Sequence, residues 1–344
     1  MTGLMKRSIS VIALMAAMNT MVFAADVTSI AILTPEQGTD FGWNQQGIDA
    51  AKAAAEAKGV KVVVAENLGY GDVRPTLREL AEDGASLLIG HASGYNTAAP
   101  EIGAEFKIPV AIVDRPDLLK AGAVADYTAS GHEGAYLAGR MAAKMSRTGI
   151  VGIVVSGEPP SWNAMSAAFA EGVKAENPKV EVRYAVIGPA AYADVAGGKR
   201  VTESVIASGA DIIFGEGNGS SFGMLQAIET NKATDGGKVY FIDVIGDKTS
   251  IDKGFLLSSV IWDLKPVYMA MIDDIKADKF GTRNYDIKLS DDSVKLLKTK
   301  SIPDDVWTSI MALRDDIIAG KVKIEPHFDA ESVHKLVTAL PAAQ

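Results

Sequence analysis

Aromatic and carboxamide side chains crowd one short segment near the beginning of the sequence, residues 41–47, which read FGWNQQG. The segment follows an apolar run and precedes an alanine-rich helical pattern. It contains no acid, base or nucleophile. Aromatic faces stack on flat rings, and a carboxamide offers a donor and an acceptor to a heterocycle edge. These residue types favour ligand recognition; the alternative is that the aromatics pack on the domain surface and the carboxamides are solvated.

Motifs for nucleotide-phosphate, nucleophilic or zinc chemistry do not occur in the sequence. There is no G-x-x-x-x-G-K-[ST] loop and no G-x-S-x-G elbow, and residues 215–220 lack the third glycine of a dinucleotide site. The histidines do not have the spacing of zinc ligands. They are His91, His132, His327 and His334. We therefore expect no enzyme activity, no cofactor and no metal.

Residues 1–24 have the pattern of a secretory signal. Lys6 and Arg7 precede an apolar run at residues 9–18, and small residues follow up to Ala24. The run is shorter than the roughly 20 residues that span a bilayer. We expect cleavage near Ala24 and a periplasmic protein.

Composition limits the possible partners. The formal net charge is −9, and removal of the signal, which carries two basic residues and no acid, makes it more negative. Such a chain does not attract nucleic acid, which requires clustered positive charge. The 344 residues include no cysteine, and they are enough for two hydrophobic cores.

An internal repeat predicts how the chain positions its polar loops. Residues 84–90 (GASLLIG) resemble residues 209–215 (GADIIFG), and each copy is followed by a small-residue loop and a second similar strand. Short apolar runs alternate with helical periods, which is typical of parallel strands joined by helices. We predict an α/β fold of two doubly wound parallel-sheet lobes. Ligands of such sheets lie at the carboxyl ends of the strands, where segment 41–47 falls.

Five short motifs, in order along the chain, resemble those of the BMP family of solute-binding proteins. They lie at residues 41–45, 132–139, 192–194, 216–219 and 257–260. Members of this family are purine nucleoside receptors of ABC importers. The resemblance implies a type I periplasmic binding protein fold, with three crossovers between the lobes and the ligand in the interlobe cleft.

The resemblance also implies lobe boundaries. By analogy, the crossovers are expected near residues 127–128, 245–246 and 261–262. The N-terminal lobe would then contain residues 26–127 and 246–262. The C-terminal lobe and tail would contain residues 128–245 and 263–344.

Several residues acquire ligand-binding roles through the resemblance. Trp43 and Tyr192 would stack on the two faces of a planar ring, while Asn44 and Asp126 would bind its edge. The remaining residues that we assign to the site are His91, Trp162, Glu216, Asp243 and Trp262.

Two departures from the family pattern affect the expected ligand. The nucleoside-binding lysine of the family falls on Trp262, and the family's G-V-D-S-D-Q reads here as residues 243–248, DVIGDK. A cleft rich in flat apolar surface suits a bare nucleobase better than a sugar. We therefore expect a purine-like base or another aromatic heterocycle.

The sequence is identified on these grounds as an exported, monomeric solute receptor that delivers a purine-like ligand to an ABC permease. An exported nucleoside hydrolase is one alternative, because Asp114, Asp126 and Asp243 follow predicted strands and the sequence gives no distances between them. A periplasmic sensor subunit is another alternative, since nothing in the sequence separates an importer from a sensor.

Overall fold

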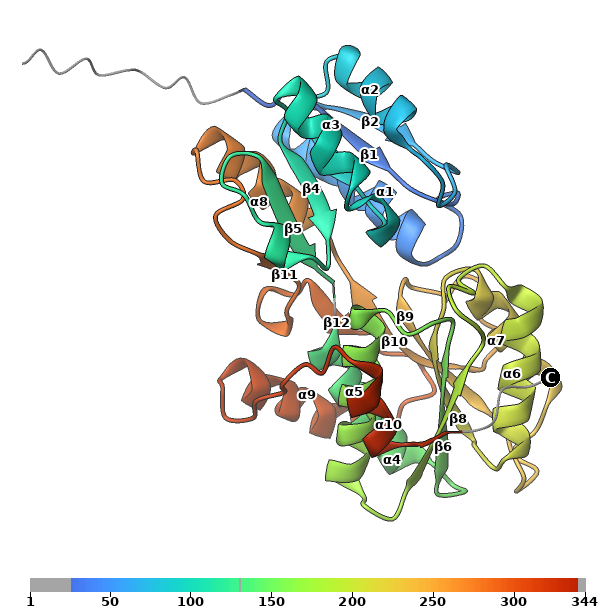
Figure 1. The fold of residues 1–344 in the computed structure, drawn as a ribbon. Coiled ribbons are helices and arrows are strands. Elements are labelled where there is room, and N and C mark those ends of the chain that lie inside the picture. Colours follow the sequence, from blue (N-terminus) through green and yellow to red (C-terminus); the bar gives the residue numbers. More distant parts are fainter. Residues whose placement is uncertain (1–25, 130, 340–344) are drawn as a thin grey trace, which may run out of the picture.

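The computed structural model describes residues 26–129 and 131–339, which form two α/β lobes that lie end to end (Figure 1). The expected signal at residues 1–24 lies outside the described residues. Each lobe contains a mainly parallel sheet with helices packed against its faces. The predicted fold class is confirmed.

The first lobe is built on a sheet with strand order β11-β5-β4-β3-β1-β2. Its strands are β1 (Ser29–Leu33), β2 (Lys61–Ala65), β3 (Leu87–Gly90), β4 (Val110–Val113), β5 (Val124–Thr128) and β11 (Tyr285–Asp286). Its helices are α1 (Trp43–Lys58), α2 (Arg74–Glu82), α3 (Ala98–Phe106) and α8 (Lys265–Lys276), with short 3₁₀ turns η1 (Ser93–Tyr95) and η2 (Pro116–Leu118). The central strands β3 and β4 are buried along their whole length, as expected of a parallel sheet covered on both faces.

The second lobe has the strand order β12-β10-β9-β8-β6-β7-β13. Its strands are β6 (Ile150–Val155), β7 (Glu181–Val186), β8 (Ile212–Glu216), β9 (Tyr240–Ile245), β10 (Leu256–Trp262), β12 (Val294–Leu296) and β13 (Thr338–Ala339). Its helices are α4 (His132–Met145), α5 (Pro160–Glu176), α6 (Val195–Ala207), α7 (Ser220–Thr230), α9 (Asp304–Ile318) and α10 (Ala330–Leu336), with the 3₁₀ turn η3 (Leu289–Asp291). The strand β12 is antiparallel to β10 at the edge of the sheet.

Helix α1 carries most of the aromatic and carboxamide segment, residues 41–47. Small residues, including Ala51, Ala54 and Ala55, form its buried face and let the helix approach the sheet closely. The helix ends at Gly59, whose left-handed φ of 66° a glycine adopts without strain. Residues 41–47 therefore lie at the carboxyl edge of the first sheet, in the end of the loop after β1 and the first turn of α1.

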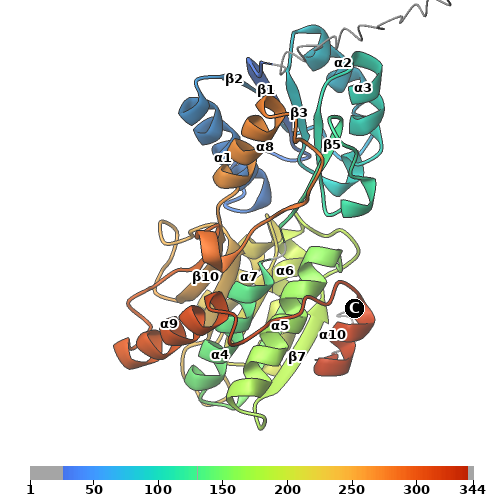
Figure 2. The ribbon, with the colours of Figure 1, turned by 90° about the vertical axis from the view of Figure 1, so that its left-hand side faces the viewer.

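The lobe boundaries differ from those expected at two of the three crossovers. The first crossover coincides with the end of β5, near residue 128. Residues 256–262, expected in the N-terminal lobe, form β10 and pair with β9 in the second sheet. The chain then returns to the first lobe, where α8 packs on α1 and β11 pairs with β5 (Figure 2). A buried apolar run fits either sheet, so the local pattern does not identify its partner strand.

After β11 the chain crosses again, and its last described part, residues 294–339, belongs to the second lobe. Helix α9 packs on α4, helix α10 packs on α5, and β13 extends the sheet beside β7. No helix of residues 26–129 or 131–339 has the length and hydropathy needed to cross a membrane.

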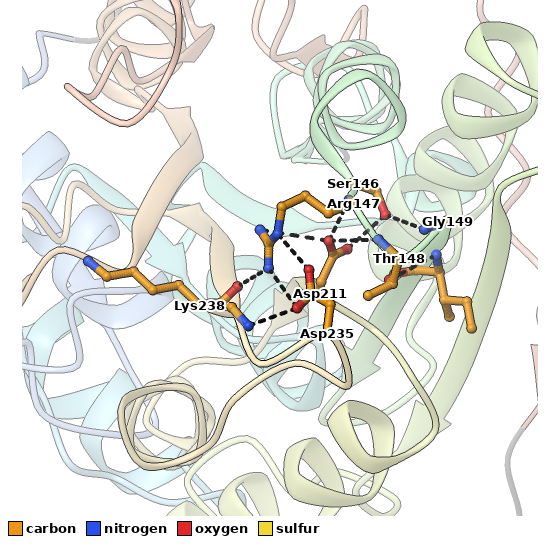
Figure 3. A network of polar contacts seen from close by, with 9 residues as sticks. Ser146, Arg147, Thr148, Gly149, Asp211, Asp235 and Lys238 are labelled. Carbon is orange, nitrogen blue, oxygen red and sulfur yellow. Dashed lines mark hydrogen bonds and ion pairs between the residues drawn. The ribbon is translucent and has the colours of Figure 1, made fainter.

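The buried carboxylate of Asp211 is the centre of a polar network before the start of β6 and β8 (Figure 3). Asp211 accepts hydrogen bonds from the Ser146 hydroxyl at 2.7 Å and from the backbone N–H groups of Arg147 at 2.6 Å and Thr148 at 3.2 Å. The Arg147 guanidinium pairs with the more exposed Asp235 at 2.9 Å. This network fixes the turn between α4 and β6.

Substitution Asp211→Ala should lower the free energy of unfolding by about 2–4 kcal/mol, because it leaves two backbone donors without an acceptor in a buried turn. Chemical denaturation measures the change. The control Asp235→Ala removes a more exposed partner of the same arginine, whose ion pair is screened by solvent, and should cost clearly less than Asp211→Ala. Equal losses in the two variants would contradict the role assigned to Asp211.

Candidate functional site

A cavity of about 220 Å³ lies between the lobes, at the carboxyl ends of the strands. Loops of the first lobe after β1, β2, β3 and β4 face loops of the second lobe after β6, β7 and β8. Five aromatic side chains line the cavity: Trp43, Tyr70, Trp162, Tyr192 and Trp262. The four of these that were predicted from the sequence are therefore brought together by the fold.

Trp43 presents one face of its indole to the cavity. The other face stacks on the imidazole of His91, with ring centroids 3.7 Å apart and planes 10° from parallel. The indole Nε1 donates a hydrogen bond to the backbone carbonyl of His91 at 2.9 Å. Trp262 meets the same indole edge-on, at 6.1 Å and 87°. A planar ligand can therefore stack only on the face of Trp43 that points away from His91.

His91 supports Trp43 from behind and does not line the cavity. Its Nε2 lies 2.8 Å from the backbone oxygen of Trp43, and its Nδ1 lies 2.7 Å from the Tyr127 hydroxyl and 3.1 Å from that of Tyr268. Burial lowers the pKa of His91 to about 4, so the ring is neutral at physiological pH. A carbonyl can only accept, so Nε2 carries the proton and Nδ1 accepts from the tyrosines.

Asn44 is turned into the lobe rather than toward the cavity. Its side-chain amide donates to Asp40 at 2.8 Å. The same carboxylate accepts the backbone N–H groups of Gly42, Asn44 and Gln45, each at 3.0 Å, and so caps the start of α1. Asn44 thus stabilises the loop that carries Trp43, and its predicted contact with a ligand edge is not made by this arrangement.

Two acidic residues of the second lobe are also buried behind the cavity surface. Glu216 accepts a hydrogen bond from the Ser166 hydroxyl at 2.6 Å, and burial raises the pKa of Glu216 well above its usual value. Asp243 forms an ion pair with Lys248 at 2.7 Å. Neither acid lines the cavity.

The carboxylates at the ends of β4 and β5 have different positions. Asp114 lines the cavity, and burial raises its pKa to about 6. Asp126 does not line the cavity; it accepts the backbone N–H of Arg115 at 2.6 Å. Burial raises the pKa of Asp126 to about 7, and the nearby charge of Asp114 adds to the shift.

Most of the lining residues were not assigned from the sequence, and Tyr70, Asp114 and Asn218 are among them. Tyr70 lies between two glycines in the loop after β2, and its ring lies 6.3 Å from that of Tyr192 across the cavity. Asn218 accepts the backbone N–H of Trp43 at 3.4 Å. An aromatic residue flanked by glycines in a strand-to-helix loop is a signal that could have identified Tyr70.

Comparison with known sequences identifies the family of the chain. A family model described as "ABC transporter substrate-binding protein PnrA-like" matches residues 27–327. The chain belongs to the Bmp family. The family predicted from five motifs is thus confirmed.

Relatives of this Bmp protein carry names from several contexts. It is 28% identical to a purine-binding protein of Brucella abortus, over 78% of this chain and 74% of the relative. It is 25% identical to basic membrane protein A1 of Borrelia garinii, over 91% and 92% of the two chains. It is also 23% identical to the transcriptional activator protein med of Bacillus subtilis, over 75% and 77%.

Solved structures share the fold. An ABC transporter solute-binding protein of Aeropyrum pernix superimposes with a TM-score of 0.74 at 19% identity, covering 90% of this chain and 96% of that chain. A solute-binding protein of Conexibacter woesei gives a TM-score of 0.70 at 21% identity, over 88% and 100%. The Bmp protein therefore has the fold of ABC transporter solute-binding proteins.

The buried carboxyl of Asp126 should make the stability of the Bmp protein depend on pH. Its folded pKa, about 7, lies above the usual 3.8, so the native state holds the proton more tightly than the unfolded state. Its contribution to stability is therefore complete below about pH 4 and is lost as the pH rises through 7.

Substitution Asp126→Asn should flatten this dependence between pH 5 and pH 8, because the amide keeps an acceptor for Arg115 N–H and does not ionise. Urea denaturation of both proteins across this range measures the effect. The exposed substitution Asp117→Asn serves as the control and should leave the curve parallel to that of the parent. A parallel curve for Asp126→Asn would overturn the assignment.

Proposed function

We propose that this Bmp protein binds a purine-like free base in the interlobe cavity and delivers it to an ABC permease. The observation that carries the proposal is the set of five aromatic side chains around one cavity. Two of them, Trp43 and Tyr70, belong to the first lobe, while Trp162 and Tyr192 belong to the second. A flat ring between the lobes would contact both and would be enclosed when they close.

The polar groups at the cavity suit the edge of a heterocycle. The indole Nε1 of Trp262 is buried and has no hydrogen-bond partner among the described residues. Asp114, with its pKa raised to about 6, can accept from a ring N–H group or, when protonated, donate to a ring nitrogen.

Trp262 and Asp243 favour a free base over its nucleoside as the ligand. Trp262 lies where the family has a nucleoside-binding lysine, and an indole offers one donor and no charge. Asp243 is already paired with Lys248, so its charge is not free for ribose hydroxyls. Hydroxyls that lose water without full replacement cost about 1–3 kcal/mol each.

The names of relatives support a purine-like ligand and a role in ABC transport. One relative is named a purine-binding protein, and another, in Lactococcus lactis, an ABC transporter nucleoside-binding protein with 27% identity over 58% of this chain. In this role the protein works outside the cytoplasm as a monomer, without a cofactor, and returns its ligand unchanged. Asp114 is the one carboxylate among the described lining residues, which favours binding over hydrolysis by paired acids.

A signalling role is the second candidate. One relative and one similar structure, a transcriptional activator of comK from Bacillus halodurans with a TM-score of 0.71, carry regulatory names. The same cavity would then report ligand to a regulatory partner instead of loading a permease. Uptake of labelled adenine that is abolished by deletion of this protein would favour the importer.

Substitutions Trp43→Ala and Tyr192→Ala should each weaken the binding of adenine, guanine or hypoxanthine by about 1–3 kcal/mol, because each removes a face on which the base stacks. Calorimetric titration measures the change in affinity. Trp43→Phe should retain most of the binding, since it keeps a flat face.

The control is Trp307→Ala, which removes a tryptophan of α9 that does not line the cavity and should leave affinity unchanged. If none of the three bases binds the parent protein, the proposed ligand class is wrong. If Trp43→Ala binds as tightly as the parent, the assigned face is wrong.

A further inference from the structure

The buried ammonium group of Lys248 makes a contact between the two lobes, and the proposed ligand site does not use this group. Lys248 follows β9 in the second lobe, and its side chain is 3% exposed. Its ammonium group lies 2.7 Å from Asp243 Oδ2, 2.8 Å from the backbone oxygen of Phe41 and 3.4 Å from that of Val244. The ammonium group thus forms an ion pair with Asp243 and donates hydrogen bonds to two backbone oxygens.

One of these three acceptors belongs to the other lobe. Asp243 and Val244 lie on β9, next to Lys248 in the chain, whereas Phe41 lies in the first lobe, in the loop before α1. Separation of the lobes would therefore leave the ion pair in place but would remove the hydrogen bond to Phe41. The cross-lobe bond is specific to the closed arrangement.

Gly246, two residues before Lys248, also lies very close to the backbone of Phe41. A Cβ at this position would lie 2.1 Å from the backbone oxygen of Phe41 and 3.0 Å from its carbonyl carbon. The third nearest atom, the backbone nitrogen of Gly42, is also in the first lobe. Any side chain at residue 246 would thus meet backbone of the opposite lobe, and only when the lobes are together.

Phe41 is held in an unusual conformation at this point. Its φ of 50° is in the left-handed region, which is uncommon for residues other than glycine. Its backbone N–H donates to the side chain of Gln45 at 3.1 Å, and its ring meets Phe222 of the second lobe edge-on at 6.1 Å. The turn that aims the Phe41 carbonyl at Lys248 is the turn that leads into Trp43.

We infer that Lys248, Gly246 and the Phe41 carbonyl form a cross-lobe latch that couples lobe closure to the placement of Trp43 and holds the lobes together without a ligand. Two further cross-lobe bonds support the same turn: Trp43 N–H donates to Asn218, and the side chain of Gln46 donates to the Trp262 carbonyl. Lys248 is a positioning residue that acts through the main chain of Phe41. The latch does not depend on the identity of the ligand.

The variant Gly246→Ala tests the latch directly. The added methyl group meets only the first lobe, so it should open the lobes and leave the fold of the second lobe intact. The matched control is Gly188→Ala in the same lobe, where the nearest atom to the new Cβ is Ala191 Cβ at 3.7 Å. Neither glycine has a positive φ that alanine would strain.

Acrylamide quenching of tryptophan fluorescence reports closure in the full chain without a ligand, because three of its four tryptophans line the cavity. We expect the quenching constant of Gly246→Ala to rise at least twofold over the parent, together with a larger radius of gyration in small-angle X-ray scattering. Gly188→Ala should match the parent in both measurements. Equal values for Gly246→Ala and Gly188→Ala would overturn the latch.

A second variant keeps the test decisive if Gly246→Ala fails to fold. The double substitution Lys248→Met with Asp243→Asn removes both charges, so no lone buried charge remains. It should also raise quenching at least twofold, and parent-like quenching would refute the role of Lys248. These measurements use no ligand, so they test the latch independently of the proposed function. If the variants open but the parent protein binds no purine base, the latch is supported and the proposed function is rejected.

Discussion

The cleft depends on the stacking of Trp43 against a buried, neutral His91. Burial keeps the imidazole uncharged, and its two nitrogens are both used, one by the Trp43 carbonyl and one by the hydroxyls of Tyr127 and Tyr268. Gly47 makes room for the ring, because a Cβ there would lie 2.3 Å from His91 Nε2. These partners come from β5, α1 and α8, so the support for one indole requires the chain to have crossed to the second lobe and returned.

The sequence predicted the fold and four aromatic side chains that line one cavity, but not the direction of the polar side chains. Buried apolar runs separated by helical periods are sufficient to indicate parallel α/β lobes, whereas the sheet that β10 joins is decided by pairing with β9. Large flat side chains at strand ends have few other uses, and four of them do line the cavity. A polar side chain at a strand end can instead turn inward when an internal partner is present, as Asn44 does with Asp40 and Glu216 with Ser166. Asp40 lies only four residues before Asn44, and Ser166 lies 50 residues before Glu216. Neither spacing identifies the two residues as partners, so the sequence pattern alone does not reveal them.

The proposed ligand would meet mainly aromatic surface in this cavity. The walls also carry the carboxyl of Asp114, whose pKa is raised toward neutrality, and the guanidinium of Arg115, which is already paired with Asp117 at 2.7 Å. The buried ion pair between Lys248 and Asp243 lies at the backbone of Phe41 and is part of the proposed latch. The two proposals thus assign closure to this ion pair and ligand binding to the flat aromatic surfaces.

The most direct test of this account is a calorimetric comparison of a purine base with its own nucleoside on the same protein, for example hypoxanthine with inosine. If the aromatic faces bind the ligand as proposed, the base should bind at least as tightly as the nucleoside, because the lining cation Arg115 is already paired with Asp117. Binding of the nucleoside tenfold or more tightly than the base would contradict the account, because it would require ribose recognition by groups that this structure pairs internally.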